Sequence, residues 1–260
     1  MPDPLDIVQQ LARQAGKFLS ETFRLSGTTA SFKPDRSFVT HADVAADRMI
    51  TAGLQEYFPG EPILSEELNT CLPESAPAAW IIDPLDGTTN FSLGLHVWGV
   101  LITRLSNGWP ELCAMYFPLL DEMYTARRGQ GAWLNGEPIH TRQPDPNQPF
   151  GFFACCSRTH HRYAVSIPYK PRILGAAAYS FCMLARGAAV IGFEVSPKIW
   201  DIAGAWLLVQ ESGGKMVSFE GPQPFPLIFG QEYKALNFPT LAAATPDLLE
   251  SAQAQISRRK

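Results

Sequence analysis

The stretch that most constrains this chain is residues 80–91, WIIDPLDGTTNF, in which a short apolar run leads into two carboxylates and a glycine. Residues 80–82 are apolar and β-branched or aromatic, which is typical of a strand buried on both faces. Pro84 disfavours helical geometry in the residue before it and lacks a backbone donor, so we expect the strand to stop at Asp83. An irregular turn would follow, in which Asp83 and Asp86 converge on one point.

The residues after this turn indicate an anion site beside the carboxylates. Gly87-Thr88-Thr89 stands where a helix would begin, so free backbone N–H groups and the positive end of a helix dipole would face the same point. Asp-Pro and Asp-Gly are also ordinary turn pairs, and turn chemistry alone would make the segment a simple loop. The motifs elsewhere in the chain decide between these two interpretations.

Three motifs together closely resemble the inositol monophosphatase family, the lithium-sensitive, magnesium-dependent phosphatases. They are residues 83–91, the Ser65-Glu66-Glu67 segment before them, and Trp200-Asp201-Ile202-Ala203-Gly204-Ala205 far downstream. The resemblance extends from about residue 39 to about residue 249. It implies the layered α-β-α-β-α sandwich of these sugar phosphatases, with an α+β N-terminal half and an α/β C-terminal half, and the hydrolysis of a phosphate monoester.

Composition narrows the partners. The net charge of −4 and the absence of a basic stripe argue against nucleic acid, and 46% hydrophobic with 18% charged residues is ordinary for a globular protein. We see neither a signal peptide nor an apolar stretch long enough to span a membrane. The five cysteines are odd in number and lack C-x-x-C spacing, so we expect reduced thiols in a cytoplasmic protein.

The N-terminal half, residues 1–142, is predicted to be α+β. Apolar residues at helical spacing predict a helix over 4–24, and Thr40 with Asp43 would cap a second helix that ends at Pro59-Gly60. Residues 63–65 read as a strand with Glu66 at its end. An antiparallel meander over 97–105, 111–117 and 122–126, with a tight hairpin at Asn135-Gly136, would follow.

Residues 143–149, with three prolines, are the expected boundary before a C-terminal α/β half at 150–260. The pattern there alternates between strands and helices. It predicts strands near 152–156, 172–174 and 189–194, and helices over 177–186, 201–212 and 246–254, the last capped by Thr245.

The resemblance implies a site for two or three Mg²⁺ ions, which favour hard oxygen ligands. Glu66, Asp83 and the carbonyl of Leu85 would hold one ion. Asp83, Asp86 and Asp201 would hold the second, and a third, weaker ion would lie near Glu66. Asp201 by itself could be only a helix N-cap, but the Trp-Asp pair opening a long apolar helix matches the family.

The implied catalytic residues are Glu66, Thr88 and Asp83, with Thr88 and Glu66 holding the attacking water. Substrate contacts would come from Asp86, Gly87, Thr88, Gly175, Ala177, Glu194 and Asp201. Two departures from the family concern Ser65, where glycine is frequent, and Ala176, where a hydroxyl residue is common. Ser65 leaves the geometry of its loop open, and Ala176 would leave one substrate contact missing.

The leaving group is open among relatives of this fold. We expect inositol 1-phosphate or another small polyol phosphate, because Thr89 and Asn90 are uncharged and Glu194 can accept hydrogen bonds from hydroxyls. A 3′,5′-bisphosphate nucleotidase is the main alternative, since residues 157–160 resemble those enzymes. Fructose 1,6-bisphosphate and histidinol phosphate, and a catalytically silent binding protein, are further alternatives. A second phosphate would depend on Arg158, His160, His161 and Lys198. By analogy with relatives, we also expect a homodimer.

Overall fold

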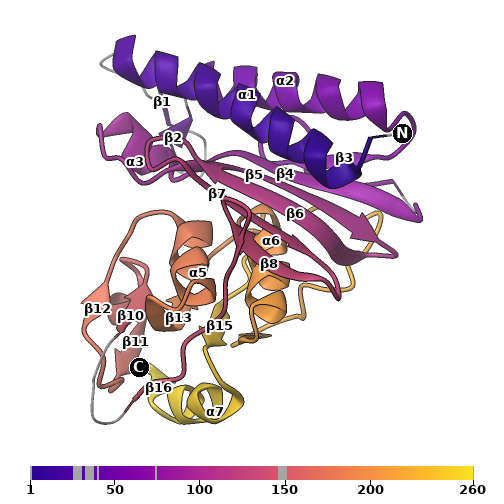
Figure 1. Cartoon of the computed structure of the whole chain (residues 1–260). Helices are drawn as coiled ribbons and strands as arrows, with labels where there is room; N and C mark the ends of the chain where they lie inside the picture. Colours follow the sequence, from indigo (N-terminus) through magenta and orange to yellow (C-terminus); the bar gives the residue numbers. More distant parts are fainter. Residues whose placement is uncertain are drawn as a thin grey trace.

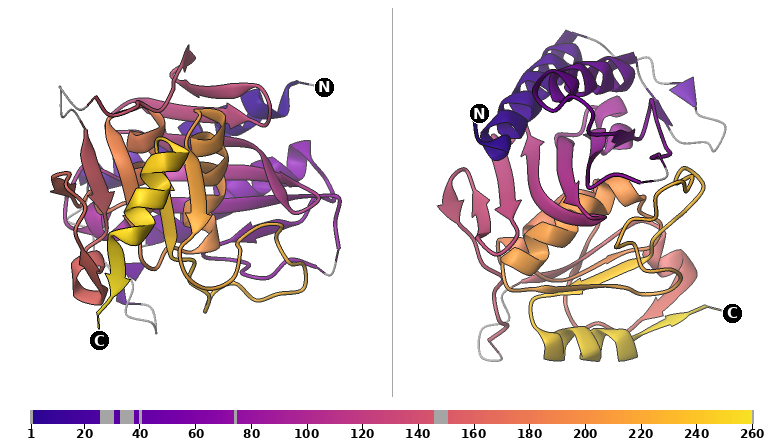
Figure 2. Two further views of the ribbon diagram at one scale, coloured as in Figure 1. Left: turned by 90° about the horizontal axis from the view of Figure 1, so that it is seen from below. Right: turned by 90° about the vertical axis from the view of Figure 1, so that its right-hand side faces the viewer.

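The computed structural model describes residues 2–25, 31–32, 38–39, 41–73, 75–145 and 151–259. They form five stacked layers in the order helix, sheet, helix, sheet, helix (Figures 1 and 2). The layered sandwich that the resemblance implies is therefore confirmed. None of the helices among these residues has both the length and the apolar character needed to cross a membrane.

Two helices and a seven-stranded sheet make up the first two layers. The helices are α1 (Pro4–Leu25) and α2 (His41–Tyr57), and a short ribbon of β1 (Ser31–Phe32) and β2 (Phe38–Val39) lies between them in the chain. The sheet has the order β3-β4-β5-β6-β7-β8-β9. Its strands are β3 (Ile63–Ser65), β4 (Ala78–Asp86), β5 (Gly99–Ser106), β6 (Trp109–Phe117), β7 (Glu122–Arg127), β8 (Gly131–Leu134) and β9 (Glu137–Pro138), and α3 (Thr88–Ser92) links β4 to β5.

The first sheet is buried on both faces, as the apolar run at 80–82 predicted. Trp80 and Ile82 lie in one core with α1 and α2, and Ile81 lies in a second core with α5 (Ala177–Ala185) and α6 (Ile199–Glu211). Successive side chains of a strand point to opposite faces, so the run serves both cores. The predicted antiparallel meander from β5 to β7 is also present.

The fourth layer is a five-stranded sheet with the order β12-β10-β13-β15-β14. Its strands are β10 (Phe152–Cys155), β12 (Pro171–Arg172), β13 (Ala189–Glu194), β14 (Lys215–Ser218) and β15 (Thr240–Ala243). Helix α7 (Pro246–Ala254) covers its outer face through a third core, and α4 (Thr159–Arg162) and a ribbon of β11 (Tyr163–Val165) with β16 (Ile256–Arg258) complete this end. The Thr245 cap is confirmed, because its hydroxyl accepts the Leu248 N–H at 3.2 Å.

The expected end of the central strand at Asp83 is wrong. β4 continues through Pro84 to Asp86, and its pairing with β5 is irregular between Asp83 and Asp86. Proline is tolerated there because a bulge does not require its missing N–H. The carboxylates therefore project from a deformed strand rather than from a free turn.

Helix α6 packs very close to the first sheet. A Cβ on Gly204 would lie 2.9 Å from Thr103 Oγ1 and 3.1 Å from Met115 Sδ, distances at which a side chain would have to displace its neighbours. The Cys113 thiol contacts the Gly204 carbonyl at 3.5 Å. Glycine at this position thus allows α6 to lie against the sheet that carries the site.

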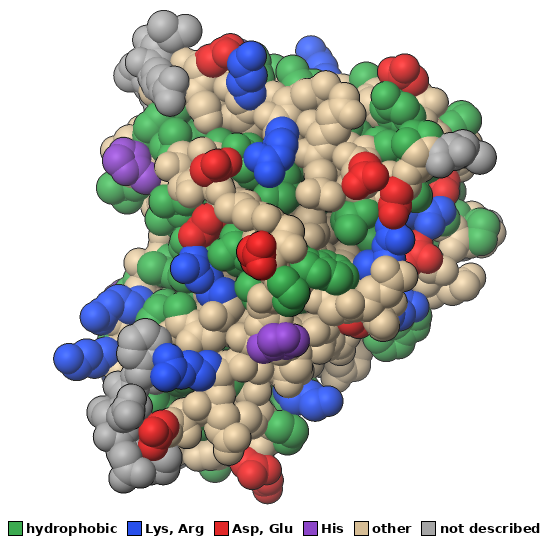
Figure 3. Space-filling model, viewed as in Figure 1, with side chains coloured by type: hydrophobic (Ala, Val, Ile, Leu, Met, Phe, Trp, Pro, Cys, Tyr) green, Lys and Arg blue, Asp and Glu red, His purple; other side chains and the backbone are tan. Residues whose placement is uncertain are grey.

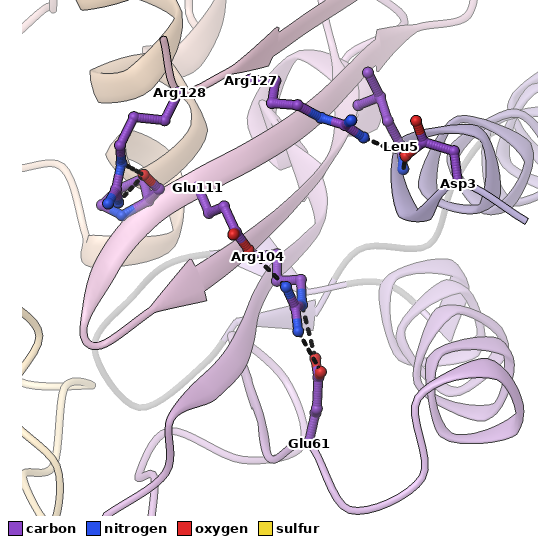
Figure 4. A network of polar contacts seen from close by, with 8 residues as sticks. Asp3, Leu5, Glu61, Arg104, Glu111, Arg127 and Arg128 are labelled. Carbon is purple, nitrogen blue, oxygen red and sulfur yellow. Dashed lines mark hydrogen bonds and ion pairs between the residues drawn. The ribbon is translucent and has the colours of Figure 1, made fainter. Parts of the chain in front are cut away.

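Arg104 on β5 joins two further segments of the first sheet (Figure 4). Its guanidinium donates to both oxygens of Glu61, at 2.9 and 2.5 Å, and to Glu111 on β6 at 2.6 Å. The guanidinium also lies over the ring of Trp80. The network fixes the segment just before β3, which leads to Glu66.

Three predictions have a different status. The Thr40 cap and residues 146–149 of the proposed boundary lie outside the described residues, and the division into halves at 142 and 150 stays a prediction.

All five cysteines carry free thiols. On the face seen in Figure 3, acidic and basic side chains are interspersed.

Candidate active site

The site begins where two parallel strands end side by side. β3 pairs parallel with β4, with Ser65 opposite Ile82, so Glu66 and Asp83 follow at the same edge. The Glu66 N–H bonds the Ile82 carbonyl at 3.3 Å. The Ser65 hydroxyl accepts the N–H groups of Leu68 and Asn69, and in this way closes the loop behind Glu66. Ser65 thus provides the turn for which the family frequently has glycine.

The irregular end of β4 is held by its own side chains. Asp83 Oδ1 accepts the Leu85 N–H at 2.9 Å, and the Thr88 hydroxyl donates to the Leu85 carbonyl at 3.0 Å. Gly87 has φ 87°, and a Cβ there would lie 2.9 Å from the Val97 carbonyl oxygen. Only glycine fits this position, which leads directly into α3.

Asn90 ties this loop to the C-terminal half. Its side-chain amide donates to the carbonyls of Val97 at 2.7 Å and Leu174 at 2.8 Å, the latter 84 residues further along the chain. Gly175 lies against the Asn90 amide, since a Cβ there would be 2.4 Å from its oxygen. The sequence offered Asn90 only as part of a motif, and its function as a tie follows from the fold.

Asp86 caps a helix from the other half of the chain. Its two carboxylate oxygens accept the N–H groups of Ala177 at 3.0 Å and Ala178 at 3.1 Å, at the start of α5. Ala177 lines the cavity as predicted, but its amide is used by Asp86. Burial raises the pKa of Asp86 to about 7, against the effect of these amides.

The sequence predicted a helix that starts at Asp201, and this start is wrong by two residues. α6 begins at Ile199, and Asp201 accepts the Lys198 N–H at 2.8 Å, so it is the third residue of the helix. The N-cap residue, Lys198, is extended, with φ −88° and ψ 172°, and the helix begins at the next residue. The position turns the Asp201 carboxylate towards the first sheet.

Glu66, Asp83 and Asp201 form a carboxylate cluster. Each offers an oxygen within 4.8 Å of the others. The pKa of Asp83 lies well above its usual value because the group is buried and because the charges of Glu66 and Asp201 are close to it. The pKa of Asp201 is raised in the same way, by burial and then by the charges of Asp86 and Glu66. The carboxylate oxygens of this cluster repel one another when charged, and hard oxygen ligands of this kind suit Mg²⁺. The residues therefore fit the predicted cofactor.

The carboxylate cluster opens into a cavity of about 1080 Å³. All the site residues predicted from the sequence line this cavity: Glu66, Asp83, Leu85, Asp86, Gly87, Thr88, Gly175, Ala177, Glu194 and Asp201. Glu194, at the end of β13, is buried, and desolvation raises its pKa to about 8. Ala176 is buried in the same wall and supplies no hydroxyl there.

Basic side chains also line the cavity. Arg158 donates to the Ser196 hydroxyl at 2.5 Å, and the Lys198 ammonium donates to the Lys234 carbonyl at 2.7 Å. Lys234 itself is a third lining cation, which the sequence analysis missed because it belongs to no motif. Among the described lining residues, His160 and His161 are not found.

Comparisons with known proteins agree with this geometry. The profile described as the inositol monophosphatase family matches residues 2–257. Nus factor SuhB of Escherichia coli K12 is 32% identical over 234 residues, covering 86% of this chain and 88% of that protein. Inositol monophosphatase 1 of Bos taurus is 31% identical over 247 residues, covering 88% and 89%.

A solved structure is similar throughout. Thermotoga maritima IMPase superimposes with a TM-score of 0.78 at 26% identity, and the match covers 96% of each chain. Fold and sequence therefore point to one group of proteins.

Proposed function

The chain belongs to the inositol monophosphatase family, and we propose that its substrate is a small polyol monophosphate, with inositol 1-phosphate as the first candidate. Proteins of this family hydrolyse phosphate monoesters, so the chain is a phosphoric monoester hydrolase. The observation that supports the finer proposal most is the position of buried Glu194 in the same cavity as the carboxylate cluster.

We propose two or three Mg²⁺ ions as cofactors. Glu66, Asp83 and the Leu85 carbonyl would hold one ion, and Asp83, Asp86 and Asp201 another. When bound, Mg²⁺ would neutralise phosphate charge and make water a stronger nucleophile. The raised pKa values of Asp83 and Asp201 support this, because a cation would offset the repulsion that raises them.

The protein groups would orient the reactants. The Leu85 carbonyl has no proton to give, so Thr88 is the donor in their hydrogen bond, and the lone pairs of its hydroxyl remain able to accept from a water. Glu66 would accept the second proton of that water and hold it in line with the phosphorus. The backbone N–H groups of Gly87 and Thr88, before and within the first turn of α3, would bind the phosphate oxygens.

Glu194 would recognise the leaving group. Its carboxyl group lies at the end of β13 and lines the cavity, where it can hydrogen-bond two hydroxyls of a polyol. The neighbouring Ala176 offers no hydroxyl, so Glu194 would contribute most of the polar recognition on this wall. A substrate rich in vicinal hydroxyls suits this arrangement.

A bisphosphate is a second candidate, favoured by the cations of the cavity. Arg158 donates to the Ser196 hydroxyl and the Lys198 ammonium donates to the Lys234 carbonyl, and Arg158, Lys198 and Lys234 all line the cavity. A cavity of about 1080 Å³ is slightly larger than the usual small-molecule site of about 300–1,000 Å³. There is thus room and charge for a second anionic group.

Steady-state assays of Arg158→Ala separate the two candidates. Inositol 1-phosphate and adenosine 3′,5′-bisphosphate, with fructose 1,6-bisphosphate and histidinol phosphate for comparison, would be tested with Mg²⁺. Our proposal expects wild type to prefer inositol 1-phosphate and the variant to retain that activity. A wild type that prefers the bisphosphate, and loses about ten- to a hundredfold of kcat/KM on it alone in Arg158→Ala, would favour the second candidate. Arg162→Ala is the matched control, because Arg162 is exposed and outside the cavity lining.

We also propose a homodimer in a reducing, cytoplasmic environment. Leu93 and Leu95, 67% and 52% exposed, are large apolar side chains next to α3 that a second copy could cover. The five free thiols support the reducing environment. A molar mass of one chain by light scattering at micromolar concentration would contradict the dimer.

A further inference from the structure

Helix α5 binds Asp86 through its first backbone amides. The N-cap residue, Ala176, has no side chain able to cap the helix, and Asp86 takes that place from β4. Both oxygens of Asp86 are engaged, at 3.0 and 3.1 Å. The position of α5 along its axis therefore determines where the Asp86 carboxylate lies.

The same helix has a second polar attachment to the first sheet. Glu122, the first residue of β7, accepts the Tyr179 hydroxyl at 3.0 Å on one oxygen and the Arg186 guanidinium at 2.5 Å on the other. Tyr124 on the same strand donates to Glu122 at 2.8 Å and lies 3.3 Å from Arg186. We call Glu122, Tyr124, Tyr179 and Arg186 the β7 clamp.

The β7 clamp grips α5 at two points. Tyr179 is in the first turn of α5 and Arg186 is its C-cap, about two turns later on the same face. A single carboxylate that binds both residues opposes rotation of the helix as well as sliding along its axis. The Glu122 side chain is 17% exposed; its bond to Tyr179 is partly buried, whereas its bond to Arg186 lies at the surface.

The β7 clamp is separate from the cavity. None of its four residues is among the cavity's described lining residues. The clamp's two α5 residues, Tyr179 and Arg186, connect it to the site through that helix. The Tyr179 ring also packs edge-on against Phe117 with centroids 4.6 Å apart, so removing its hydroxyl leaves the ring supported.

We propose that the β7 clamp is a positioning device that sets Asp86 for cation binding by fixing the start of α5. It rests on the proposed function only in counting Asp86 among the Mg²⁺ ligands. Without the clamp, the amides of Ala177 and Ala178 would no longer hold both oxygens of Asp86, and the carboxylate would sample other orientations. Groups that orient a ligand in this way typically change metal affinity by about 10- to 100-fold.

Calorimetric titration with Mg²⁺ alone tests this without any substrate. In Tyr179→Phe and Glu122→Gln we expect the Kd for Mg²⁺ to rise about tenfold. In steady-state assays the lost kcat should return at high Mg²⁺ while KM for the ester changes little. In Arg186→Lys, which keeps one charged donor, we expect a smaller rise.

Tyr163→Phe is the matched control. The Tyr163 hydroxyl donates to Glu220 at 2.8 Å in the third core, and neither residue is among the cavity's described lining residues. This variant loses a hydrogen bond of the same kind, and we expect a similar change in Tm with unchanged Mg²⁺ affinity. In an Asp86→Asn background, Tyr179→Phe should have no further effect on Mg²⁺ binding.

Unchanged Mg²⁺ affinity in folded Tyr179→Phe, or equal weakening in Tyr163→Phe, would overturn the inference, and so would a wild type that binds no Mg²⁺. Failure of the proposed function looks different. In that case wild type binds Mg²⁺ with the expected dependence on the β7 clamp and hydrolyses none of the tested esters.

Discussion

Asp83 of β4 and Asp201 of α6 come from opposite halves of the chain, and an oxygen of each lies within 4.8 Å of the other and of Glu66. The two residues are far apart in the sequence, and they meet only because α6 packs against the first sheet. The pair therefore couples the chemistry of the site to the packing of the layers.

Asp83→Asn should nearly abolish hydrolysis. The asparagine removes one charge from the carboxylate cluster, and the loss should be about a hundredfold or more, as for other groups that stabilise transition-state charge. Because the substitution also relieves repulsion within the cluster, the Mg²⁺-free variant should be at least as stable as wild type. Measurements of kcat/KM at saturating Mg²⁺ and of Tm check both parts. Near-normal turnover in a folded variant would refute the role of Asp83.

Mg²⁺ should stabilise the whole chain. An ion bound only by the folded state, at about 100 times its Kd, adds about 2.7 kcal/mol to the free energy of unfolding. In Asp201→Asn this gain should be strongly reduced, because the ligand from the C-terminal half is lost. Denaturant unfolding with and without Mg²⁺ measures it. Glu250→Gln, at an exposed position of α7, is the control that should keep the full gain.

The Mg²⁺-free protein should become less stable as pH rises through neutrality, in part because of Glu194. Burial raises the pKa of Glu194 from 4.5 to about 8, so between these values the folded chain holds a proton that the unfolded chain has released. The free energy of unfolding therefore falls with rising pH in this window.

Glu194→Gln removes that proton, and the slope should become shallower by up to about 1.4 kcal/mol per pH unit. Denaturant unfolding in a chelator between pH 5 and 8 measures the slope, with Glu250→Gln as control. An unchanged slope in Glu194→Gln would mean that this carboxyl group is not the one that holds the proton.

Arg104→Lys should destabilise the protein by about 1–2 kcal/mol. A lysine cannot reproduce the two parallel bonds to Glu61 together with the bond to Glu111. Arg13→Lys is the comparison, since Arg13 pairs with Asp121 at 3.6 Å on the surface and should cost less than about 0.5 kcal/mol. Equal losses in the two variants would show that the Arg104 network adds no more than a surface ion pair.

Li⁺ at millimolar concentrations should inhibit hydrolysis. A small monovalent cation prefers the same hard oxygens as Mg²⁺ and would compete for the position near Asp86 and Asp201. Inhibition curves with LiCl, against NaCl at equal ionic strength, measure the effect. If both salts act alike, the site lacks the lithium sensitivity that the family resemblance implied.

The meeting of the carboxylates was easier to predict from the sequence than the structure around them. Glu66, Asp83 and Asp201 stand in motifs, so their meeting could be expected from resemblance. The continuation of β4 through Pro84 could not, because local propensity opposes it and only the pairing with β5 maintains it. Lys234 belongs to no motif, and only the folded loop brings it to the cavity.

Three strands near the C-terminus were not predicted from the sequence, for a similar reason. β14, β15 and β16 are three or four residues long, and β15 finds its partners far away in the chain. Short strands carry little periodic signal, and what stabilises them is tertiary pairing. The cap of Asp86 by α5 and the β7 clamp are likewise long-range contacts between residues that no local pattern relates.

The two faces of the first sheet are covered by helices made at different times. α1 and α2 precede its strands, whereas α5 and α6 are synthesised only after β9 is complete. When β9 has just left the ribosome, the nascent chain therefore exposes Ile81, Leu101 and Met115, because the helices that bury them have not yet been made. Transiently exposed apolar surface of this kind makes a folding intermediate prone to aggregation. The carboxylate cluster itself is completed late, because its member Asp201 lies in α6 and emerges after the whole of the first sheet.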